Sequence, residues 1–257
     1  MKINDNLILK KLINKYSHLR EKSSNKYPLA SNPFEMKDII EGCKVLLSGR
    51  ITMSSITKKF EKEFAKYLGI KHALMVNSGS SANLLAFFAL INPKNKKKIF
   101  NNDECIIPAL CWSTSLWPIV QAGLKPKFVD IDPNTLNLDL YKVQKAITKK
   151  TKAILAVHIL GNSTDMNKLK KIVDKNNLTL IEDTCESLGS KYKNKFLGTF
   201  GQFSTFSFYY SHQISSVEGG MISCKSKADD DIIKSLRSHG WARDLSNQKQ
   251  IEPNASF

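Results

Sequence analysis

The sequence predicts an α/β fold in which a mostly parallel sheet carries helices on both faces. Between residues 71 and 183, apolar segments of strand length alternate with segments of helical length. These strand segments are apolar throughout, as is typical of strands that are buried on both sides of a parallel sheet. In such sheets ligands bind beyond the carboxyl ends of the strands, so we expect functional residues in the loops that follow the strands.

The first 70 residues are expected to be mainly helical. Residues 1–35 have the pattern of a helix followed by a polar segment that two prolines interrupt. Helical spacing returns at Glu35–Leu47 and at Ser55–Leu68, where apolar residues recur every four positions along one face. Gly69 is expected to end the second of these helices, because glycine is favoured just past a helix C-terminus.

From residue 71 onward the expected elements form repeated strand–helix units. Strands are expected at 71–77, 104–110, 127–131, 152–159 and 178–183, and helices at 79–91, 113–122, 138–147 and 165–176. The stretch Phe203–Gly220 begins as an aromatic and β-branched strand and continues into a polar turn that contains His212. A last helix is expected at 228–238.

Composition limits the classes of function. With 42% hydrophobic and 24% charged residues, the 257-residue chain is typical of a soluble globular protein. It has no long apolar run and its N-terminus lacks the features of a secretory signal, so we expect a cytoplasmic protein without a membrane span. The net charge of +16 could indicate a nucleic-acid partner, but nearly all of the 39 basic residues are lysines. Specific phosphate and base contacts favour arginine, so we expect no nucleic-acid partner.

The five cysteines argue against a disulfide framework and against a metal site. They are an odd number and include no C-x-x-C pair: Cys43, Cys105, Cys111, Cys185 and Cys224. We therefore expect free thiols and no bound metal.

One candidate site is the segment 77–82, Asn-Ser-Gly-Ser-Ser-Ala, which joins an expected strand to an expected helix. Its hydroxyls lie beside free backbone N–H groups at a helix N-terminus, and this arrangement suits a phosphate. A plain helix cap explains the segment equally well, because Ser and Gly are favoured there in any case. The chain has neither G-x-x-x-x-G-K-[ST] nor G-x-G-x-x-G, so a P-loop and a dinucleotide site are both excluded as explanations.

Three further side chains are candidates, each with an ordinary alternative. Trp112 could stack on a flat ring, although tryptophan is more often a core residue. Asp183 ends an apolar strand and would lie at the mouth of the sheet, although a lone aspartate is more often a helix cap. His212 is a titratable group on a turn, and a surface-loop histidine is the commoner explanation when that stretch is taken alone.

Five segments taken together resemble the DegT/DnrJ/EryC1/StrS family of sugar aminotransferases and dehydratases, which are fold-type-I pyridoxal-phosphate (PLP) enzymes. The segments occur in order as NSGSSANLL, CWSTSLWPIVQAGLKPKFVDID, HILGNSTDMNKL, IEDTCESLGS and TFSFYYSHQISSVEGGM. The resemblance implies that residues 36–245 form the PLP-binding large domain and that residues 1–35 form a helical and extended N-terminal segment. It also implies that residues 246–257 begin a small C-terminal domain, most of which this chain lacks.

The resemblance implies a role for each candidate residue. The family's phosphate-binding positions correspond to Gly79, Ser80 and Ser207. Trp112 would stack on the pyridine ring, and Asp183 would pair with the pyridinium nitrogen so that the ring can act as an electron sink. Glu186 would lie near the polar edge of the cofactor.

One departure from the family pattern decides the expected reaction. Where the aminotransferases have S-F-x-x-x-K with the Schiff-base lysine, this chain has the sequence SFYYSH from Ser207 to His212. Histidine can move protons near neutral pH but cannot hold PLP covalently. The chain therefore resembles the branch that removes the 3-hydroxyl from nucleotide-linked 4-keto-6-deoxy sugars. His212 would be the catalytic residue, noncovalent PLP or pyridoxamine phosphate (PMP) the cofactor, and L-glutamate the amino donor.

Several alternatives concern the substrate and the state of the site. We expect a GDP-linked sugar of the mannose type, used in deoxysugar and lipopolysaccharide O-antigen biosynthesis, with CDP- or dTDP-linked sugars as alternatives. The subtype with a [2Fe–2S] cluster is disfavoured, because it needs three cysteines after the region of Arg243 and this chain has none there. A catalytically silent homologue that binds cofactor or nucleotide sugar is a further alternative. The resemblance also implies a homodimer.

Overall fold

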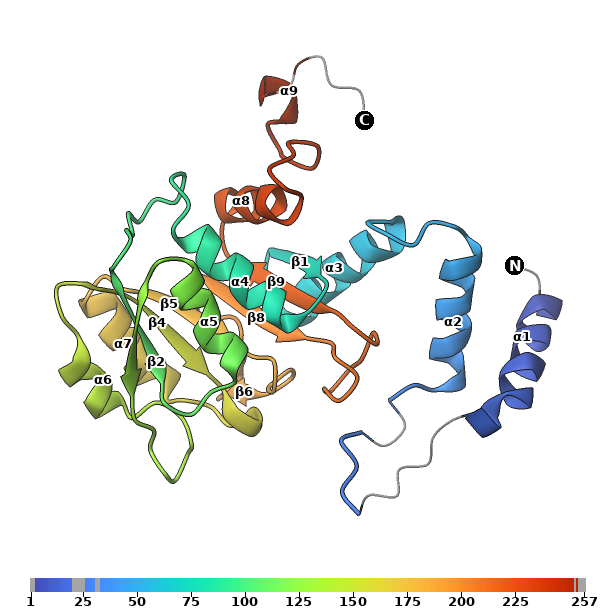
Figure 1. Cartoon of the computed structure of the whole chain (residues 1–257), viewed down its shortest axis with the longest axis horizontal. Coiled ribbons are helices and arrows are strands. Elements are labelled where there is room, and N and C mark those ends of the chain that lie inside the picture. The colour runs from blue at the N-terminus through green and yellow to red at the C-terminus, as the bar shows by residue number, and fades with distance from the viewer. Residues whose placement is uncertain (1–2, 20–25, 31–32, 252, 254–257) are drawn as a thin grey trace.

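The computed structural model describes residues 3–19, 26–30, 33–251 and 253. Its centre is a seven-stranded sheet with the order β1-β9-β8-β5-β4-β2-β3 (Figure 1). The strands are β1 (His72–Val76), β2 (Glu104–Pro108), β3 (Lys125–Val129), β4 (Thr151–Val157), β5 (Thr179–Asp183), β8 (Phe203–Ser207) and β9 (Gly220–Cys224). Within this sheet β9 runs antiparallel to both of its neighbours, and the other neighbouring strands pair in parallel. The carboxyl ends of the parallel strands therefore share one edge.

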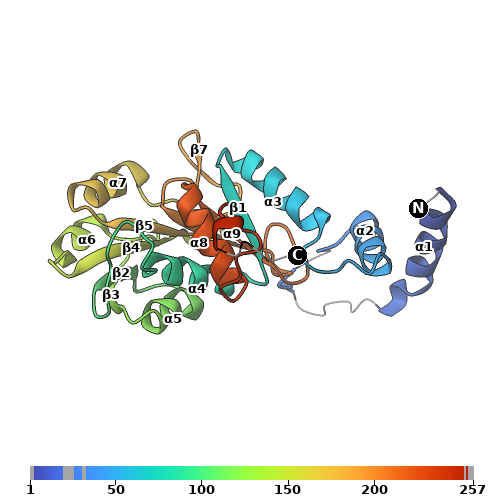
Figure 2. The same cartoon turned by 90° about the horizontal axis from the view of Figure 1, so that it is seen from above.

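Helices cover both faces of the sheet (Figure 2). One face carries α3 (Ser55–Leu68), α6 (Leu140–Ala146) and α7 (Met166–Lys175), and the other carries α4 (Gly79–Leu90), α5 (Ser113–Gln121) and α8 (Lys227–Arg237). The predicted fold class, a mostly parallel sheet with helices on both faces, is confirmed.

Alternation along the strands assigns each side chain to one of these two layers. Leu155 and Ile181 belong to the core beneath α4, α5 and α8, whereas Ile154 and Leu180 belong to the core beneath α6 and α7. Because successive strand residues point to opposite faces, Asp183 lies on the same side as Ile181. The two acids that end β5 therefore face different helices.

The N-terminal elements lie apart from the sheet (Figure 1). They are α1 (Ile3–Lys15), a short 3₁₀ turn at Ser17–Leu19 and α2 (Met36–Leu47). Parts of the two expected terminal segments fall outside the described residues. In the N-terminal segment these are residues 1–2, 20–25 and 31–32, and in the C-terminal segment they are 252 and 254–257. The C-terminal segment also contains α9 (Gln248–Ile251). The domain boundaries at 36 and 245 stay a prediction.

Several element boundaries differ from those expected. β3 begins at Lys125 rather than at residue 127, and α6 begins at Leu140 because the Asp139 side chain accepts hydrogen bonds from the N–H groups of Tyr141 and Lys142 at 2.9 and 3.2 Å. Strand β9 was not expected, nor were the short hairpin of β6 (Lys191–Tyr192) and β7 (Lys195–Phe196) and the 3₁₀ turn at Ile159–Gly161.

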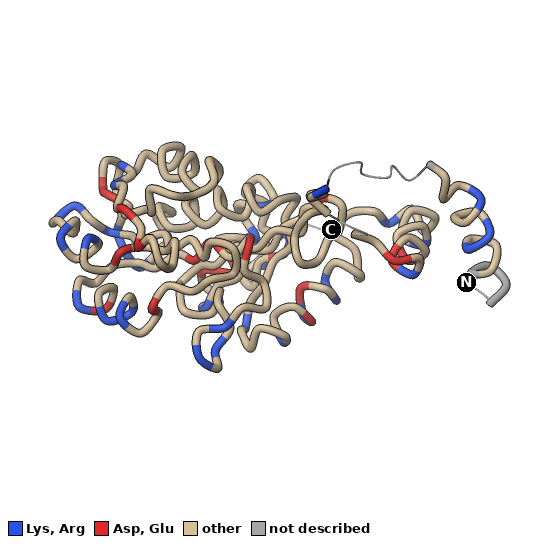
Figure 3. The backbone as a smooth tube through the Cα atoms, turned by 90° about the horizontal axis from the view of Figure 1, so that it is seen from below, with Lys and Arg blue, Asp and Glu red and all other residues tan. Residues whose placement is uncertain are grey.

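Lys and Arg positions occur from one end of the molecule to the other (Figure 3). All five cysteines are free thiols. Among the described residues, no helix combines the length and the apolar character needed to cross a bilayer.

Candidate active site

The carboxyl edge of the sheet brings the predicted site residues together. The segments that follow β1, β2, β5 and β8 each carry at least one of them. The strands adjoining β5 on its two sides are β4 and β8, so the end of β5 lies at the middle of this edge.

The loop after β1 has the geometry of a tight anion cradle. Ser78 caps α4, and its side chain accepts a hydrogen bond from the N–H of Ser81 at 3.0 Å. No described residue accepts a hydrogen bond from the N–H of Gly79 or of Ser80. The helix cap and the free donors expected at 77–82 thus occur together, and the free donors point past the helix end, as they do in phosphate sites.

Gly79 is buried where α4 meets the end of β8. A Cβ atom at this position would lie 2.7 Å from the Sγ of Cys185 and 2.7 Å from the Cβ of Ser207. No side chain fits in this space without moving a neighbour, whereas Ser80 next to it is exposed. Ser207 is 7% exposed and its hydroxyl accepts a hydrogen bond from the N–H of Tyr209 at 3.3 Å. Gly79 and Ser207 therefore lie together, as the predicted phosphate site requires.

Asp183 is held by a fixed set of donors. It is 5% exposed, and its Oδ2 accepts hydrogen bonds from Asn83 Nδ2 at 2.9 Å and from Ser115 Oγ at 2.7 Å. Its Oδ1 accepts one from the N–H of Cys185 at 3.2 Å, and Thr205 Oγ1 donates to Asn83 Oδ1 at 2.8 Å and so fixes the orientation of that amide. An ionised carboxylate in this setting can still accept a further bond from a cationic N–H group.

Sequence reasoning missed Asn83 and Ser115. Both are 1% exposed, on α4 and α5 respectively. The one available signal was an asparagine directly before the apolar run LLAFFAL of the same expected helix, since buried polar side chains need partners.

Trp112 is not a core residue. It occupies the N-cap position of α5 and is 71% exposed, so the ordinary alternative for this tryptophan is wrong. An exposed indole at the strand edge offers a flat apolar face to a ligand ring.

His212 lies on the turn that follows β8 and is half-buried. Its backbone N–H donates to the carbonyl of Tyr209 at 3.0 Å, and no described residue makes a hydrogen bond to its ring. Burial lowers the pKa of the imidazole, and the carboxylates of Glu186 and Asp183 act in the opposite direction. The ring is therefore neutral at neutral pH, which is the form that accepts a proton.

Glu186 connects two loops at the site. Its Oε2 accepts a hydrogen bond from the N–H of Leu160 at 2.9 Å, and its backbone carbonyl accepts one from Gln213 Nε2 at 2.7 Å. Leu160 has φ of 51°, a left-handed conformation that is uncommon for leucine. Glu186 thereby fixes both the loop after β4 and the residue next to His212, and its predicted place near a cofactor stays a prediction.

The model of the DegT/DnrJ/EryC1/StrS aminotransferase family matches residues 35–255 of the chain. The chain belongs to this family. The family resemblance drawn from the five sequence segments is therefore confirmed.

Individual proteins resemble this chain in sequence and in structure. The chain is 43% identical over 233 residues to the GDP-4-keto-6-deoxy-D-mannose 3-dehydratase of Yersinia pseudotuberculosis, a match that covers 88% of this chain and 59% of that protein. An Escherichia coli GDP-4-keto-6-deoxy-D-mannose-3-dehydratase with bound hydrated PLP superposes with a TM-score of 0.84 at 42% identity, over 90% of this chain and 62% of that one.

A second solved structure is a mutant GDP-4-keto-6-deoxymannose-3-dehydratase with bound GDP-perosamine. It has a TM-score of 0.81 and 43% identity, over 86% of this chain and 57% of that one. The chain thus spans about three fifths of the length of these DegT/DnrJ/EryC1/StrS relatives.

A second buried carboxylate, Glu182, lies beneath the site. Sequence reasoning also missed this residue. Glu182 and His158 are both fully buried, and Glu182 Oε2 lies 3.2 Å from His158 Nε2. Glu182 also accepts hydrogen bonds from the N–H groups of Gly198, Phe200 and Gly201 at 2.9, 2.7 and 2.6 Å. Burial alone would raise the pKa of Glu182, but these bonds from His158 and the backbone hold it below its usual value. Glu182 thus fixes the 198–201 loop on the face away from Asp183.

Proposed function

We propose that the chain is the cofactor-binding part of a PLP-dependent nucleotide-sugar 3-dehydratase that acts on a GDP-4-keto-6-deoxymannose type sugar. The observation that carries this proposal is the sequence SFYYSH from Ser207 to His212, which by the family resemblance puts a histidine at the position of the aminotransferases' Schiff-base lysine. The relatives that are 42–43% identical and bear the dehydratase name support the same assignment.

The residues present fit PLP or PMP held without a covalent bond. The cofactor's phosphate suits the free N–H groups at Gly79 and Ser80, where the absence of a Cβ leaves room against Ser207. Asp183 offers a buried carboxylate to a protonated ring nitrogen, and Trp112 offers an exposed ring for stacking. When bound, the cofactor supplies an electron sink for bonds next to the sugar's carbonyl carbon.

The chain's own residues supply binding, orientation and proton transfer. His212, neutral because burial lowers its pKa, takes up a proton on a ring nitrogen and can return it to the departing C3 hydroxyl. Asn83 and Ser115 keep the Asp183 carboxylate in one orientation. Glu186 holds the backbone beside His212 through Gln213. Because the histidine cannot take the lysine's covalent role, the site favours elimination over amine transfer to the sugar.

The partners and setting follow the same proposal. L-glutamate is the amino donor that returns the cofactor to PMP, the sugar carries GDP, and the cytoplasm is the compartment. CDP- and dTDP-linked sugars stay the alternative substrates. We place the pathway in deoxysugar and lipopolysaccharide biosynthesis.

A homodimer is part of the proposal. Large apolar side chains around the site are between 43% and 79% exposed, and they come from separate loops: Leu110, Trp112, Leu160, Ile214 and Val217. Exposed apolar side chains gathered around a functional site are typical of an interface, and we propose that a second copy of the chain covers them.

The test mixes the chain with PLP and L-glutamate and records the absorbance spectrum together with 2-oxoglutarate formation. We expect conversion from the PLP band to the PMP band, and a chain that binds PLP without conversion would be the silent homologue instead. His212→Lys should capture PLP covalently, so that borohydride adds the cofactor's mass to the variant and not to the wild type. Ammonia release with GDP-, CDP- and dTDP-4-keto-6-deoxy sugars then identifies the substrate.

A further inference from the structure

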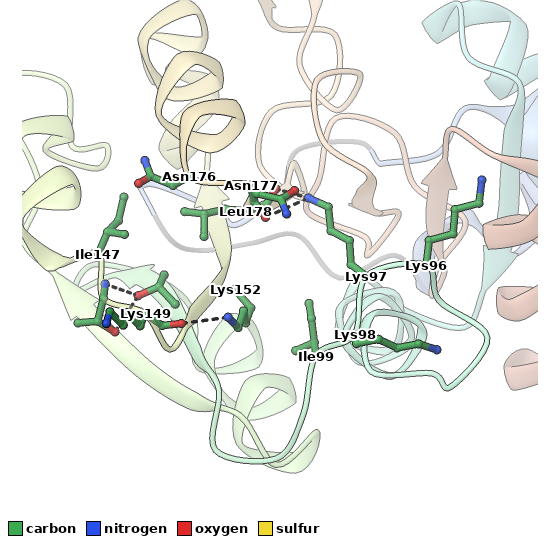
Figure 4. Close-up of a pocket in the computed structure, with 12 residues that line it drawn as sticks. Lys96, Lys97, Lys98, Ile99, Ile147, Lys149, Lys152, Asn176, Asn177 and Leu178 are labelled. Carbon is green, nitrogen blue, oxygen red and sulfur yellow. Dashed lines mark hydrogen bonds between the residues drawn. The ribbon is translucent and has the colours of Figure 1, made fainter.

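A cavity of about 600 Å³ opens at the edge of the sheet opposite the candidate active site (Figure 4). Its walls come from the segments 96–99, 147–152 and 176–178. These segments lead into β2, β4 and β5, so the cavity lies where those strands begin, whereas the cofactor residues lie where the strands end. Nothing in the proposed dehydratase chemistry uses this edge.

The lining is strongly basic. Five of the twelve lining residues are lysines, and none is an aspartate or a glutamate: Lys96, Lys97, Lys98, Lys149 and Lys152. In the part of the chain that the structure describes, none of these five ammonium groups lies within ion-pair distance of a carboxylate. The positive charge around the cavity is therefore not neutralised by the protein.

Two acids lie close to the lining, and both are already engaged by other donors. Asp174 pairs with Lys170 at 2.9 Å. Glu104 accepts hydrogen bonds from the hydroxyls of Thr148 and Thr151 at 2.6 and 3.0 Å and from Lys127 at 3.4 Å. The pKa of the Glu104 carboxyl is lowered, chiefly by the hydrogen bond from the Thr148 hydroxyl. Glu104 thus stays ionised within its own network and gives no counter-charge to the cavity's lysines.

Two of the lysines are half-buried and held in place. Lys97 Nζ donates to the backbone carbonyls of Leu178 at 2.6 Å and of Asn177 at 3.3 Å, and Figure 4 shows it reaching toward them. Lys152 Nζ donates to the carbonyl of Lys149 at 2.9 Å. An ammonium has three N–H donors, so both lysines keep donors free for a ligand. Burial and then the charge of Lys170 lower the pKa of Lys97, and the carboxylate of Asp174, which is not within ion-pair distance of Lys97, acts in the opposite direction.

The other lining groups suit a ligand larger than a single ion. Ile99, Ile147 and Leu178 give apolar surface, and Asn176 and Asn177 give amides. Lys96 and Lys98 point away from the centre in Figure 4 and add positive charge at longer range. A volume of about 600 Å³ lies within the range of about 300–1,000 Å³ that is usual for small-molecule sites.

We propose that this cavity is a binding site for a diphosphate group, either as free pyrophosphate or as part of a nucleoside diphosphate. A diphosphate carries at least two negative charges along its length, and Lys97 and Lys152 line the cavity from two different segments, each with N–H donors free. A single phosphate carries less charge over a shorter length, so we expect it to engage fewer of the five lining lysines. The proposal stands independently of the dehydratase assignment, because the two sites lie at opposite edges of the sheet.

The test measures pyrophosphate binding by calorimetry to protein that has been saturated with PLP, so that the Gly79 cradle is occupied. Lys97→Met combined with Lys152→Met keeps the apolar side-chain stems and removes both charges, and we expect affinity to fall about tenfold or more. The control, Lys10→Met with Lys11→Met, removes the same charge from exposed positions on α1 and should leave the affinity unchanged. Equal affinity of the double variant and the wild type would overturn the proposal.

Two further arms complete the test. Lys149→Met removes an exposed lysine that donates no side-chain hydrogen bond to a described residue, so it should weaken pyrophosphate binding while leaving the melting temperature unchanged. Inorganic phosphate should bind at least tenfold more weakly than pyrophosphate, and equal binding would overturn the assignment to a diphosphate. Competition by GDP would identify a nucleoside diphosphate as the ligand, whereas pyrophosphate binding that GDP does not reduce would identify the free anion.

Discussion

Replacing Gly79 by alanine tests the cofactor cradle most directly. The added Cβ would lie 2.7 Å from both Cys185 Sγ and Ser207 Cβ, whereas ordinary contact begins at 3.4 Å, so each neighbour must retreat by several tenths of an ångström. Ser207 cannot retreat easily, because β8 is paired with β9 on one side and with β5 on the other. Overpacking of this kind costs about 1–3 kcal/mol.

The expected result has two parts. The melting temperature should fall by about 4–8 °C, the shift that about 2 kcal/mol gives in a domain of this size. The affinity for PLP, measured by absorbance titration, should fall by about tenfold, because Ser207, one of the two displaced groups, is a proposed phosphate ligand.

Gly42→Ala is the matched control for this prediction. Gly42 lies within α2, and no neighbouring atom comes within 4 Å of the place that a Cβ would take, so alanine fits without displacing a neighbour. This variant should keep its affinity for PLP and gain about 0.5–1 kcal/mol of stability from the better helix propensity of alanine. A Gly79→Ala protein that binds PLP and melts like the wild type would refute the tight cradle.

Three other variants address the neighbouring groups. Glu186→Gln removes a carboxylate that raises the pKa of His212, so the acid limb of the rate profile for glutamate-dependent conversion should move to lower pH; a move to higher pH would contradict this. Ser115→Ala removes one donor from the Asp183 carboxylate and should cost about 2 kcal/mol in urea unfolding, and an unchanged midpoint would show that the bond contributes little. Glu182→Gln turns an amide toward buried backbone donors and should destabilise by about 3–5 kcal/mol. Because the pKa of Glu182 is lowered from the usual 4.5, the variant should also lose this carboxylate's share of the stability decline expected of the wild type as the pH falls below that value.

The sequence predicted those helices and strands whose course and ends depend on neighbouring residues in the chain. The helix predicted at Ser55–Leu68 has those bounds in the structure, because an apolar face and a terminal glycine specify both its course and its end. Strand β9 is different. Its five residues, GMISC, have no marked pattern of their own, and they form a strand because β8 and β1 pair with them on both sides.

The candidate site likewise contains residues that the sequence could identify and residues that only the structure reveals. The segments around Gly79, Asp183 and His212 could be found from the sequence because each combines a strand end with residues of a recognisable pattern. The partners that orient Asp183 could not, because Asn83 and Ser115 lie 100 and 68 positions away from it in the chain. Such contacts depend on how α4 and α5 pack on the sheet, and no local pattern encodes that packing.

The position of β9 in the sheet has a consequence for the order of folding. Val76 of β1 pairs with Gly220 of β9, and a side chain at Gly220 would collide with the backbone of Ser78 and Gly79. The loop of residues 77–82, the proposed phosphate site, therefore takes its shape only after two segments more than 140 positions apart have met. Contacts of such separation form slowly, because a long loop must close first. Binding of PLP during refolding should therefore appear late, after most of the helical signal has returned, and would serve as a reporter that the sheet is complete.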